Sequence, residues 1–175
     1  MTVGGRGFDS WDNQKTEIIK MDENKKCSWS VVEPDSKFGP GESIYYHSLV
    51  TVESSDINEE YVLLIGGLTN RRRMKNIFKF NGTWLIFGQL KKPRRYHNSI
   101  YLNGAVYVIG GRTKKDGFDV EHKTKIEIWN IKDSPDQFKT KENWPELFSW
   151  DNPHLFIVPD SFFPDHRICF LSCFK

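Results

Sequence analysis

Hydrophobic and polar positions follow one another in short runs separated by turn residues. From Tyr96 to Leu102 the residues Tyr96, Asn98, Ile100 and Leu102 alternate with His97, Ser99 and Tyr101, and after Asn103-Gly104 comes the continuous apolar run Ala105 to Ile109. Alternation with a period of two is typical of a half-buried strand, and a continuous apolar run is typical of a strand buried on both faces. Asn-Gly supplies the positive backbone angles of a two-residue turn. The stretch therefore predicts a β-hairpin that stops at the double glycine Gly110-Gly111.

The same hairpin pattern occurs earlier in the chain. Residues 46–52 are followed by the apolar run 61–65 and by Gly66-Gly67, with a longer acidic connection between the two runs. The two double glycines lie 44 residues apart, and a third copy is cut short at Gly4-Gly5. A fixed spacing in this range indicates a repeat architecture. No stretch shows sustained helical spacing, so the expected fold class is all-β.

A second hairpin is predicted after each double glycine. In it a large residue precedes Asp or Asn, at Met21-Asp22, Phe80-Asn81 and Trp129-Asn130, and a tryptophan follows, at Trp29, Trp84 and Trp144. With these features residues 2–159 resemble the kelch repeat family, whose tyrosine in the pair is replaced here by Met, Phe and Trp. The resemblance implies a β-propeller of four-stranded antiparallel blades. In it the structural repeat positions are Gly4, Gly5, Gly66, Gly67, Gly110, Gly111, Trp29, Trp84 and Trp129.

The repeat spacing also predicts how the chain is divided. We expect the outer half of a truncated blade with a linker in 1–43, one blade each in 44–92 and 93–149, and the start of a further blade with an irregular tail in 150–175. A kelch blade takes about 50 residues and a propeller about four to eight blades, so the chain would form an incomplete ring of about three and a half blades. We therefore expect part of a longer propeller. Two alternatives stay open: residues 154–159 supply the missing inner strand, or two chains complete one ring.

Charge is distributed unevenly along the chain. Residues 1–60 carry 6 basic and 12 acidic side chains, residues 61–130 carry 14 and 4, and residues 131–175 carry 5 and 7. In a four-stranded antiparallel blade, the connection from the second to the third strand and the connection to the next blade emerge on the same face. The basic residues of these connections should therefore gather in one patch for an acidic partner: Arg71, Arg72, Arg73, Lys75, Lys91, Lys92, Arg94, Arg95, Arg112, Lys114 and Lys115. The alternative is a solvated loop face that only keeps the protein soluble.

Catalytic and metal-binding patterns are weak. His47 and His97 occupy matching strand positions, where kelch repeats that bind no metal often carry His, so we expect structural roles and no cofactor. The three cysteines, Cys27, Cys169 and Cys173, have no fourth ligand at metal-site spacing, and whether the last two form a disulfide stays open. An enzyme of the galactose-oxidase-like propeller class is the alternative, although its copper ligands are not seen.

These patterns together predict a non-catalytic protein–protein interaction module of the kelch-propeller type, with an acidic protein as its partner. Nucleic-acid or polyanion binding is a further alternative, but the aromatic residues fall mainly in expected strands rather than among the basic loops. The sequence has neither a membrane-spanning apolar stretch nor a signal-peptide pattern. The cytoplasm is slightly favoured, and secretion stays open because the N-terminus falls inside a repeat.

Overall fold

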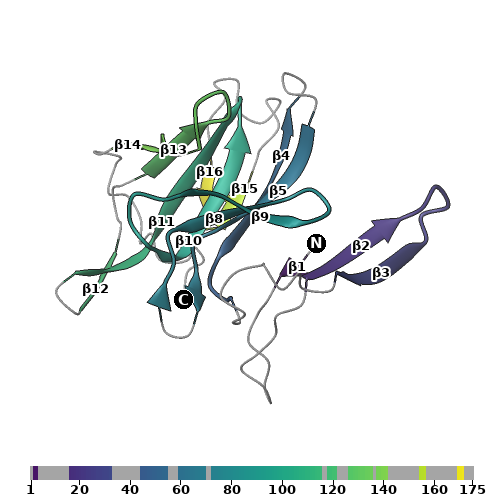
Figure 1. The fold of residues 1–175 in the computed structure, drawn as a ribbon, viewed down its shortest axis with the longest axis horizontal. Helices are drawn as coiled ribbons and strands as arrows, with labels where there is room; N and C mark the ends of the chain where they lie inside the picture. Colours follow the sequence, from purple (N-terminus) through teal and green to yellow (C-terminus); the bar gives the residue numbers. More distant parts are fainter. Residues whose placement is uncertain are drawn as a thin grey trace, which may run out of the picture.

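The computed structural model describes residues 2–3, 16–32, 44–54, 59–69, 72–115, 118–121, 126–135, 137–141, 154–156 and 169–171. The regular elements in these ranges are β-strands, and every strand pairing among them is antiparallel (Figure 1). The expected all-β class is therefore confirmed. Within these ranges no helix is long and apolar enough to cross a membrane.

Three sheets make up most of the described fold. The first sheet has the order β1-β2-β3, from Thr2–Val3, Thr16–Met21 and Cys27–Val32. The second sheet has the order β4-β5-β8-β9, from Ser48–Ser54, Glu59–Ile65, Asn76–Phe80 and Trp84–Gln89. The third sheet has the order β10-β11-β13-β14, from Arg95–Leu102, Ala105–Lys115, Ile126–Asn130 and Lys139–Lys141.

Short strands complete the fold. A small ribbon, β6 (Leu68–Thr69) with β7 (Arg72–Arg73), interrupts the connection from β5 to β8. Strand β12 (Phe118–Glu121) pairs with the far half of β11. Near the C-terminus β15 (His154–Phe156) pairs with β16 (Cys169–Leu171), and β15 contacts β10.

The second and third sheets repeat one register. Val62 of β5 pairs with Phe80 of β8, as Val106 of β11 pairs with Trp129 of β13. Moving along these strands, Leu64 pairs with Phe78, and Val108 pairs with Glu127. Two stretches with different side chains thus follow the same backbone path, as the recurring pattern predicts.

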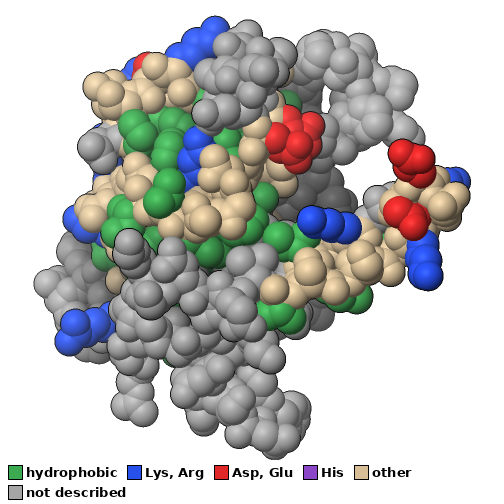
Figure 2. Space-filling model, turned by 45° about the vertical axis from the view of Figure 1, so that its right-hand side comes forward, with side chains coloured by type: hydrophobic (Ala, Val, Ile, Leu, Met, Phe, Trp, Pro, Cys, Tyr) green, Lys and Arg blue, Asp and Glu red, His purple; other side chains and the backbone are tan. Residues whose placement is uncertain are grey.

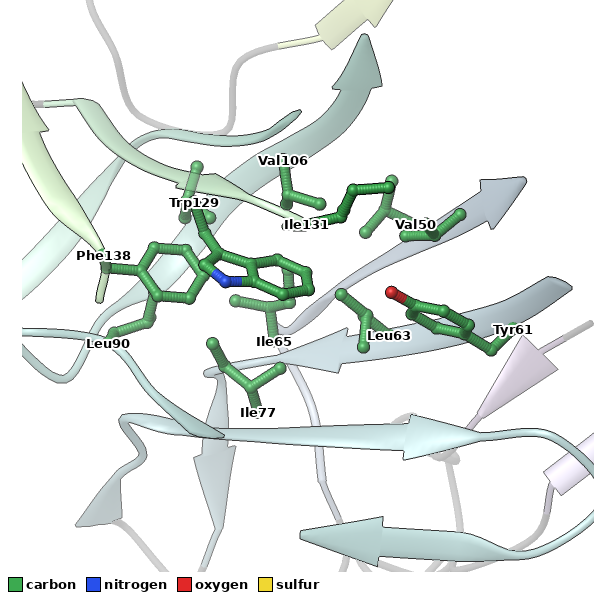
Figure 3. Close-up of a cluster of buried hydrophobic side chains, with 12 residues drawn as sticks. Val50, Tyr61, Leu63, Ile65, Ile77, Leu90, Val106, Trp129, Ile131 and Phe138 are labelled. Carbon is green, nitrogen blue, oxygen red and sulfur yellow. The ribbon is translucent and has the colours of Figure 1, made fainter. Parts of the chain in front are cut away.

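The main core lies between the second and third sheets. Leu63, Ile65 and Ile77 of the second sheet pack against Val106 and Trp129 of the third, and all five are almost fully buried (Figure 3). Leu64, between two of these positions, belongs to a separate cluster on the opposite face of β5. Side chains of a strand alternate between its faces, so a run that is apolar at every position serves both clusters.

A second cluster joins the other face of the second sheet to the first sheet. Leu64, Phe78 and Trp84 form it, and Ile18 of β2 packs against them. Trp84 is only 4% exposed, whereas Trp29 is 63% exposed. Trp29 pairs with Ile19, the neighbour of Ile18, so it lies on the opposite face of its sheet from the cluster. Trp29 is therefore not part of this cluster, and its place in the repeat stays a prediction.

The turn at Asn103-Gly104 is confirmed, with φ angles of 49° and 76°. The expected stop at Gly110-Gly111 is wrong, because β11 continues through both glycines to Lys115. Their φ angles of 70° and 84° turn the strand without ending it, and residues 112–115 then pair with β12. The connection that carries Arg112 and Lys114 is therefore a second hairpin, in which Arg112 lies opposite Glu121.

The strands of the second sheet lie within residues 44–92, and those of the third sheet lie within residues 93–149. Strands β2 and β3 lie in residues 1–43, where the outer half of a truncated blade was expected. The irregular C-terminal tail was expected to lack strands, yet it contains β16. Gly4, Gly5 and Trp144 lie outside the described residues.

Candidate functional site

The basic connections meet at one end of the second and third sheets. This end, where β4 and β10 begin and β5 finishes, is called the basic end below. The N–H of Gly67, just after β5, donates to the carbonyl oxygen of Arg94 at 2.9 Å. The N–H of Arg94 in turn donates to Met74 at 3.2 Å, and that of Leu90 donates to Lys75 at 2.7 Å. The connection from β5 to β8 and the connection from β9 to β10 are therefore bonded side by side.

Four of the predicted contact residues are exposed at this end: Arg72, Lys75, Lys91 and Lys92. They come from the two connections that the backbone hydrogen bonds join. The opposite end of the same sheets carries the hairpin turns at 81–83 and 103–104. Topology thus concentrates the basic residues at one end, although they are scattered in the sequence.

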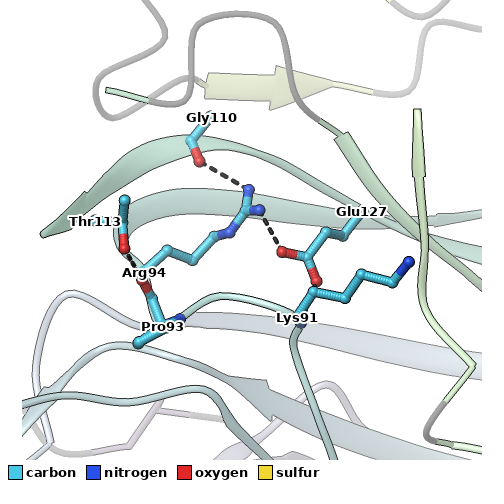
Figure 4. Close-up of polar contacts among 6 residues, drawn as sticks. All are labelled: Lys91, Pro93, Arg94, Gly110, Thr113 and Glu127. Carbon is cyan, nitrogen blue, oxygen red and sulfur yellow. Dashed lines mark hydrogen bonds and ion pairs between the residues drawn. The ribbon is translucent and has the colours of Figure 1, made fainter. Parts of the chain in front are cut away.

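Arg94 corrects the prediction, because it cannot contact a partner. Its side chain is 1% exposed and pairs with Glu127 at 2.5 Å, while its Nη1 donates to the carbonyl oxygen of Gly110 at 3.1 Å (Figure 4). The other carboxylate oxygen of Glu127 accepts the N–H of Lys91 at 2.8 Å. Burial lowers the pKa of Arg94, and the charge and hydrogen bond of Glu127 act in the opposite direction and keep it charged.

This ion pair fixes the linker between the two sheets. Glu127 lies on β13, and Arg94 and Lys91 lie in the connection that leads into β10. Thr113 also donates from its hydroxyl to the carbonyl oxygen of Pro93 at 2.7 Å (Figure 4). A buried charge with a hydrogen-bonded partner tolerates little displacement, because removing either group leaves the other charged and desolvated. The linker is therefore held in one path beneath the exposed lysines.

Three further arginines are partly buried at the basic end. Arg95 and Arg112 are cross-strand partners of β10 and β11. Arg73 ends β7, and its pKa is lowered by burial first and then by the positive charge of Arg95. Arg112 and Arg73 therefore each lie near Arg95.

Aromatic rings lie among these cations. The rings of Tyr46 and Tyr96 are 4.1 Å apart between centroids, and the guanidinium carbon of Arg95 lies 4.9 Å from the ring of Tyr96. The sequence pattern assigned these tyrosines to strands away from the basic loops. Both lie at strand starts, so they belong to the basic end, and only the three-dimensional arrangement reveals this.

Of the remaining predicted contact residues, Lys114 and Lys115 are placed only by their strand register. Lys114 and Lys115 lie in the part of β11 that pairs with β12, with Asp119 and Phe118 as their register partners. Arg71 lies outside the described residues. The site is therefore best represented by the exposed cations of the two connections and by the three partly buried arginines.

The two histidines lie beside the glycine pairs. A Cβ on Gly67 would lie 2.9 Å from the Cβ of His47, and one on Gly111 would lie 2.8 Å from the Cβ of His97. Burial lowers the pKa of His47 to about 4. Across the described ranges no three His, Cys, Asp or Glu side chains are grouped so that they could hold a metal ion. Glycine is required at positions 67 and 111 because the backbones approach too closely there for any side chain.

Comparisons with known proteins give a fold likeness and no family. No protein-family model matches the chain, and no curated protein matches its sequence. Among solved structures it is similar to a chain in the cryo-EM structure of RAG in complex with one melted RSS and one unmelted RSS, with a TM-score of 0.57 and 13% sequence identity. The match covers 81% of this chain and 48% of that chain, so this chain spans about half the length of its neighbour. At this identity the likeness concerns the fold alone.

Proposed function

We propose that the chain is a kelch-type repeat protein, in which the second and third sheets are blades of a β-propeller, and that it is a non-catalytic protein interaction module. Its basic end binds an acidic segment of a partner protein. The repeated register of the two sheets and the repeated double glycines support the assignment of blades. The likeness in fold to a chain of the RAG complex is compatible with it and carries no function.

One observation carries the proposed binding role. The connections from β5 to β8 and from β9 to β10 are bonded together, and their cations point outward from this joint: Arg72, Lys75, Lys91 and Lys92 are exposed. Loops held by a rigid scaffold are frequent binding surfaces. Clustered positive charge attracts acidic segments and accelerates their association.

The test is charge reversal at the exposed cations. The variant Arg72→Glu, Lys75→Glu, Lys91→Glu and Lys92→Glu leaves the buried pair intact. Proteins captured by the immobilised full chain are purified, and their affinity for wild type and variant is measured. Because each exposed ion pair contributes about 0.2–1 kcal/mol, loss of four should weaken a genuine acidic partner about tenfold or more.

The matched control uses the hairpin of the first sheet. Its tip carries acidic and basic side chains together (Figure 2), and Lys20, Lys25 and Lys26 are exposed there. Reversal of these three lysines should leave the affinity unchanged. If both variants bind as wild type does, while circular dichroism shows both folded, the basic end is not the binding surface.

Polyanion binding is tested in the same assay. The faces of Tyr46 and Tyr96 lie against each other and against Arg95, so they are not arranged as a platform for stacked bases. A single-stranded oligonucleotide should therefore bind only through charge and lose its affinity steeply as salt rises. Retention of that affinity at physiological salt would favour nucleic acid over an acidic protein.

A further inference from the structure

The first sheet turns an apolar face to solvent. Ile19 and Trp29 are register partners, and Val31 lies two residues beyond Trp29, so the three side chains share one face. All three are exposed, and they are called the open face below. Ile18, on the opposite face, packs against the second sheet. The second sheet, by contrast, buries apolar side chains on both of its faces. Neighbouring exposed apolar side chains mark an interaction surface.

The first sheet also has an unfilled strand edge. Both β2 and β8 end at a large residue before Asp or Asn, so residues 18–21 of β2 correspond to residues 77–80 of β8. In the second sheet all four of these positions pair with β5. In the first sheet β1 pairs only with Thr16 and Glu17. Among the described strands, none pairs with residues 18–21 on that side, and an open edge of this kind is a template for another strand.

The C-terminal hairpin is the complementary half of such a sheet. Strand β15 contacts β10, the first strand of the third sheet, as β10 contacts β4, the first strand of the second sheet. Strand β16 then pairs with β15 antiparallel, as β5 pairs with β4. Within the described ranges that sheet ends at β16. The hairpin β15–β16 therefore corresponds to the first two strands of a sheet, and β2–β3 correspond to the last two.

The third sheet offers a surface that fits the open face. Tyr107 and Ile128 are cross-strand partners on its face away from the second sheet, and both are only partly buried. By the shared register Tyr107 corresponds to Leu63, which is fully buried between the second and third sheets. The outward face of the third sheet is therefore of the kind on which a further sheet packs.

The two half-sheets lie at opposite ends of the stack within one copy. The first sheet packs on the second, and β15 contacts the third, so two complete sheets stand between the halves. In Figure 1 the hairpin β2–β3 extends away from the other sheets. A second copy can bring its own hairpin to this open edge. The match in fold to the solved structure spans about half of that chain, which leaves the length of a second set of sheets.

We propose that the first sheet is a docking surface for a second copy of this chain, whose β15–β16 hairpin pairs along residues 18–21 and whose third sheet packs on the open face. A two-fold axis makes both junctions at once. Each copy contributes two complete sheets and two halves, so the pair contains six sheets, within the about four to eight blades of a propeller. The proposal rests on the assignment of the sheets as blades, and it leaves the basic end free.

The first test is the oligomeric state of the full chain, measured by analytical ultracentrifugation over a range of concentrations. We expect a dimer of twice 20.5 kDa. Trp29→Glu should lower the dimer affinity about tenfold or more, because a charge replaces the largest side chain of the open face. Trp29 is exposed in one copy, so this variant should still fold. Leu85→Glu changes a similarly exposed apolar side chain on β9, and as the matched control it should leave the dimer unchanged.

A mixture of two variants tests the direction of the contact. Phe170→Pro interrupts the pairing of β16, so neither this variant nor Trp29→Glu should dimerise alone. Mixed, the two variants retain one intact junction and should form a dimer that is weaker than that of wild type. A Phe170→Pro variant that dimerises alone as wild type does would overturn the proposal, because the open faces would then pair with each other.

Two further outcomes overturn the proposal. A chain that stays monomeric at every concentration would leave the open face to another polypeptide segment. A mass that keeps growing with concentration would show contacts that do not close into a ring. The proposed function is judged separately, since charge reversal at the exposed cations of the basic end leaves the open face and the C-terminal hairpin in place, and Trp29→Glu leaves those cations unchanged.

Discussion

At equivalent buried positions the second sheet has two apolar side chains, and the third sheet has an ion pair. In the second sheet Ile44, which lies two residues before Tyr46, and Phe78 share a hydrophobic cluster. In the third sheet the equivalent positions, two residues before Tyr96 and opposite Val108, hold Arg94 and Glu127. All four side chains are nearly fully buried. The same backbone therefore accepts either an apolar pair or an ion pair, provided that both partners change together.

This difference shows which positions of the repeat need the same residue in both sheets and which can differ. The glycine pairs and the histidines beside them are common to both sheets, because the strands approach too closely there for other residues. The buried pair, Ile44 and Phe78 in the second sheet or Arg94 and Glu127 in the third, can vary provided that both residues change together. An ion pair costs desolvation but fixes geometry, and here it also holds the N–H of Lys91.

The largest expected effect comes from breaking the buried pair. Arg94→Ile or Glu127→Phe alone should lower the free energy of unfolding by about 3–5 kcal/mol, because the remaining charge is left buried without its partner. The double variant copies the apolar pair of the second sheet and should recover most of this loss. Urea denaturation of the four proteins measures the coupling between the two sites.

If the losses in free energy of unfolding of the two single variants add in the double variant, the exchange of the ion pair for an apolar pair is contradicted. Additive losses would mean that the third sheet cannot accept the apolar pair, and that the two sheets differ in more than this exchange.

An intermediate effect is expected at the glycine pair of the third sheet. A Cβ on Gly111 would lie 2.6 Å from the carbonyl oxygen of Arg95, and its φ angle of 84° already disfavours other residues. Gly111→Ala should therefore lower the free energy of unfolding by about 2–4 kcal/mol. Gly104→Ala, at a φ angle of 76° but with nothing within 4 Å, isolates the backbone term and should cost about 1 kcal/mol.

Gly67→Ala tests the equivalent glycine of the second sheet. Its Cβ would meet His47 at 2.9 Å and the carbonyl oxygen of Tyr45 at 3.0 Å, so it should cost slightly less than Gly111→Ala. Thermal and chemical denaturation give the ranking. A cost for Gly104→Ala equal to that for Gly111→Ala would show that close approach of the strands is unimportant.

A further effect, smaller than the loss of the buried pair, is a pH dependence from His47. Its pKa is lowered to about 4 by burial, against about 6.5 in an unfolded chain. Between these values the unfolded state binds more protons, so stability is complete above pH 6.5 and falls as the pH drops toward 4. Because His47 is partly exposed, the loss should be on the order of 1–3 kcal/mol.

Replacement of His47 by Gln removes this titration, so the slope of stability against pH should flatten in that window. His97→Gln, measured in parallel, assigns the slope to one of the two equivalent positions. An unchanged slope in His47→Gln would locate the proton uptake elsewhere.

Local sequence signals predicted the strands well, because they act within a few residues. Asn103-Gly104 determines its turn, and the polar turn residues 22–25 separate the two strands of the first hairpin. The continuation of β11 past Gly110 was not predictable in this way, since a glycine can end a strand or bend it. Only the pairing with β12 decides which of the two occurs.

The candidate site was predictable in its location but not in its membership. Topology alone indicated that the basic connections share one end, and the backbone hydrogen bonds of Gly67 and Met74 agree. The burial of Arg94 was not predictable, because its partner Glu127 lies 33 residues away and looks like an ordinary strand residue. Nor did the pattern place Tyr46 and Tyr96 among the arginines, since a positive φ angle at tyrosine has no sequence signal.

Trp84 and Trp129, both buried, lie against opposite faces of the second sheet. Trp84 belongs to the cluster toward the first sheet, and Trp129 belongs to the cluster between the second and third sheets, 5.1 Å from the ring of Phe87. Each indole therefore emits light from a different interface. The chain has four further tryptophans, which are common to the wild type and to both variants. The emission lost in Trp84→Phe is therefore that of the first interface, and the emission lost in Trp129→Phe is that of the second. Fluorescence can thus reveal whether the layers separate one after the other or in a single step.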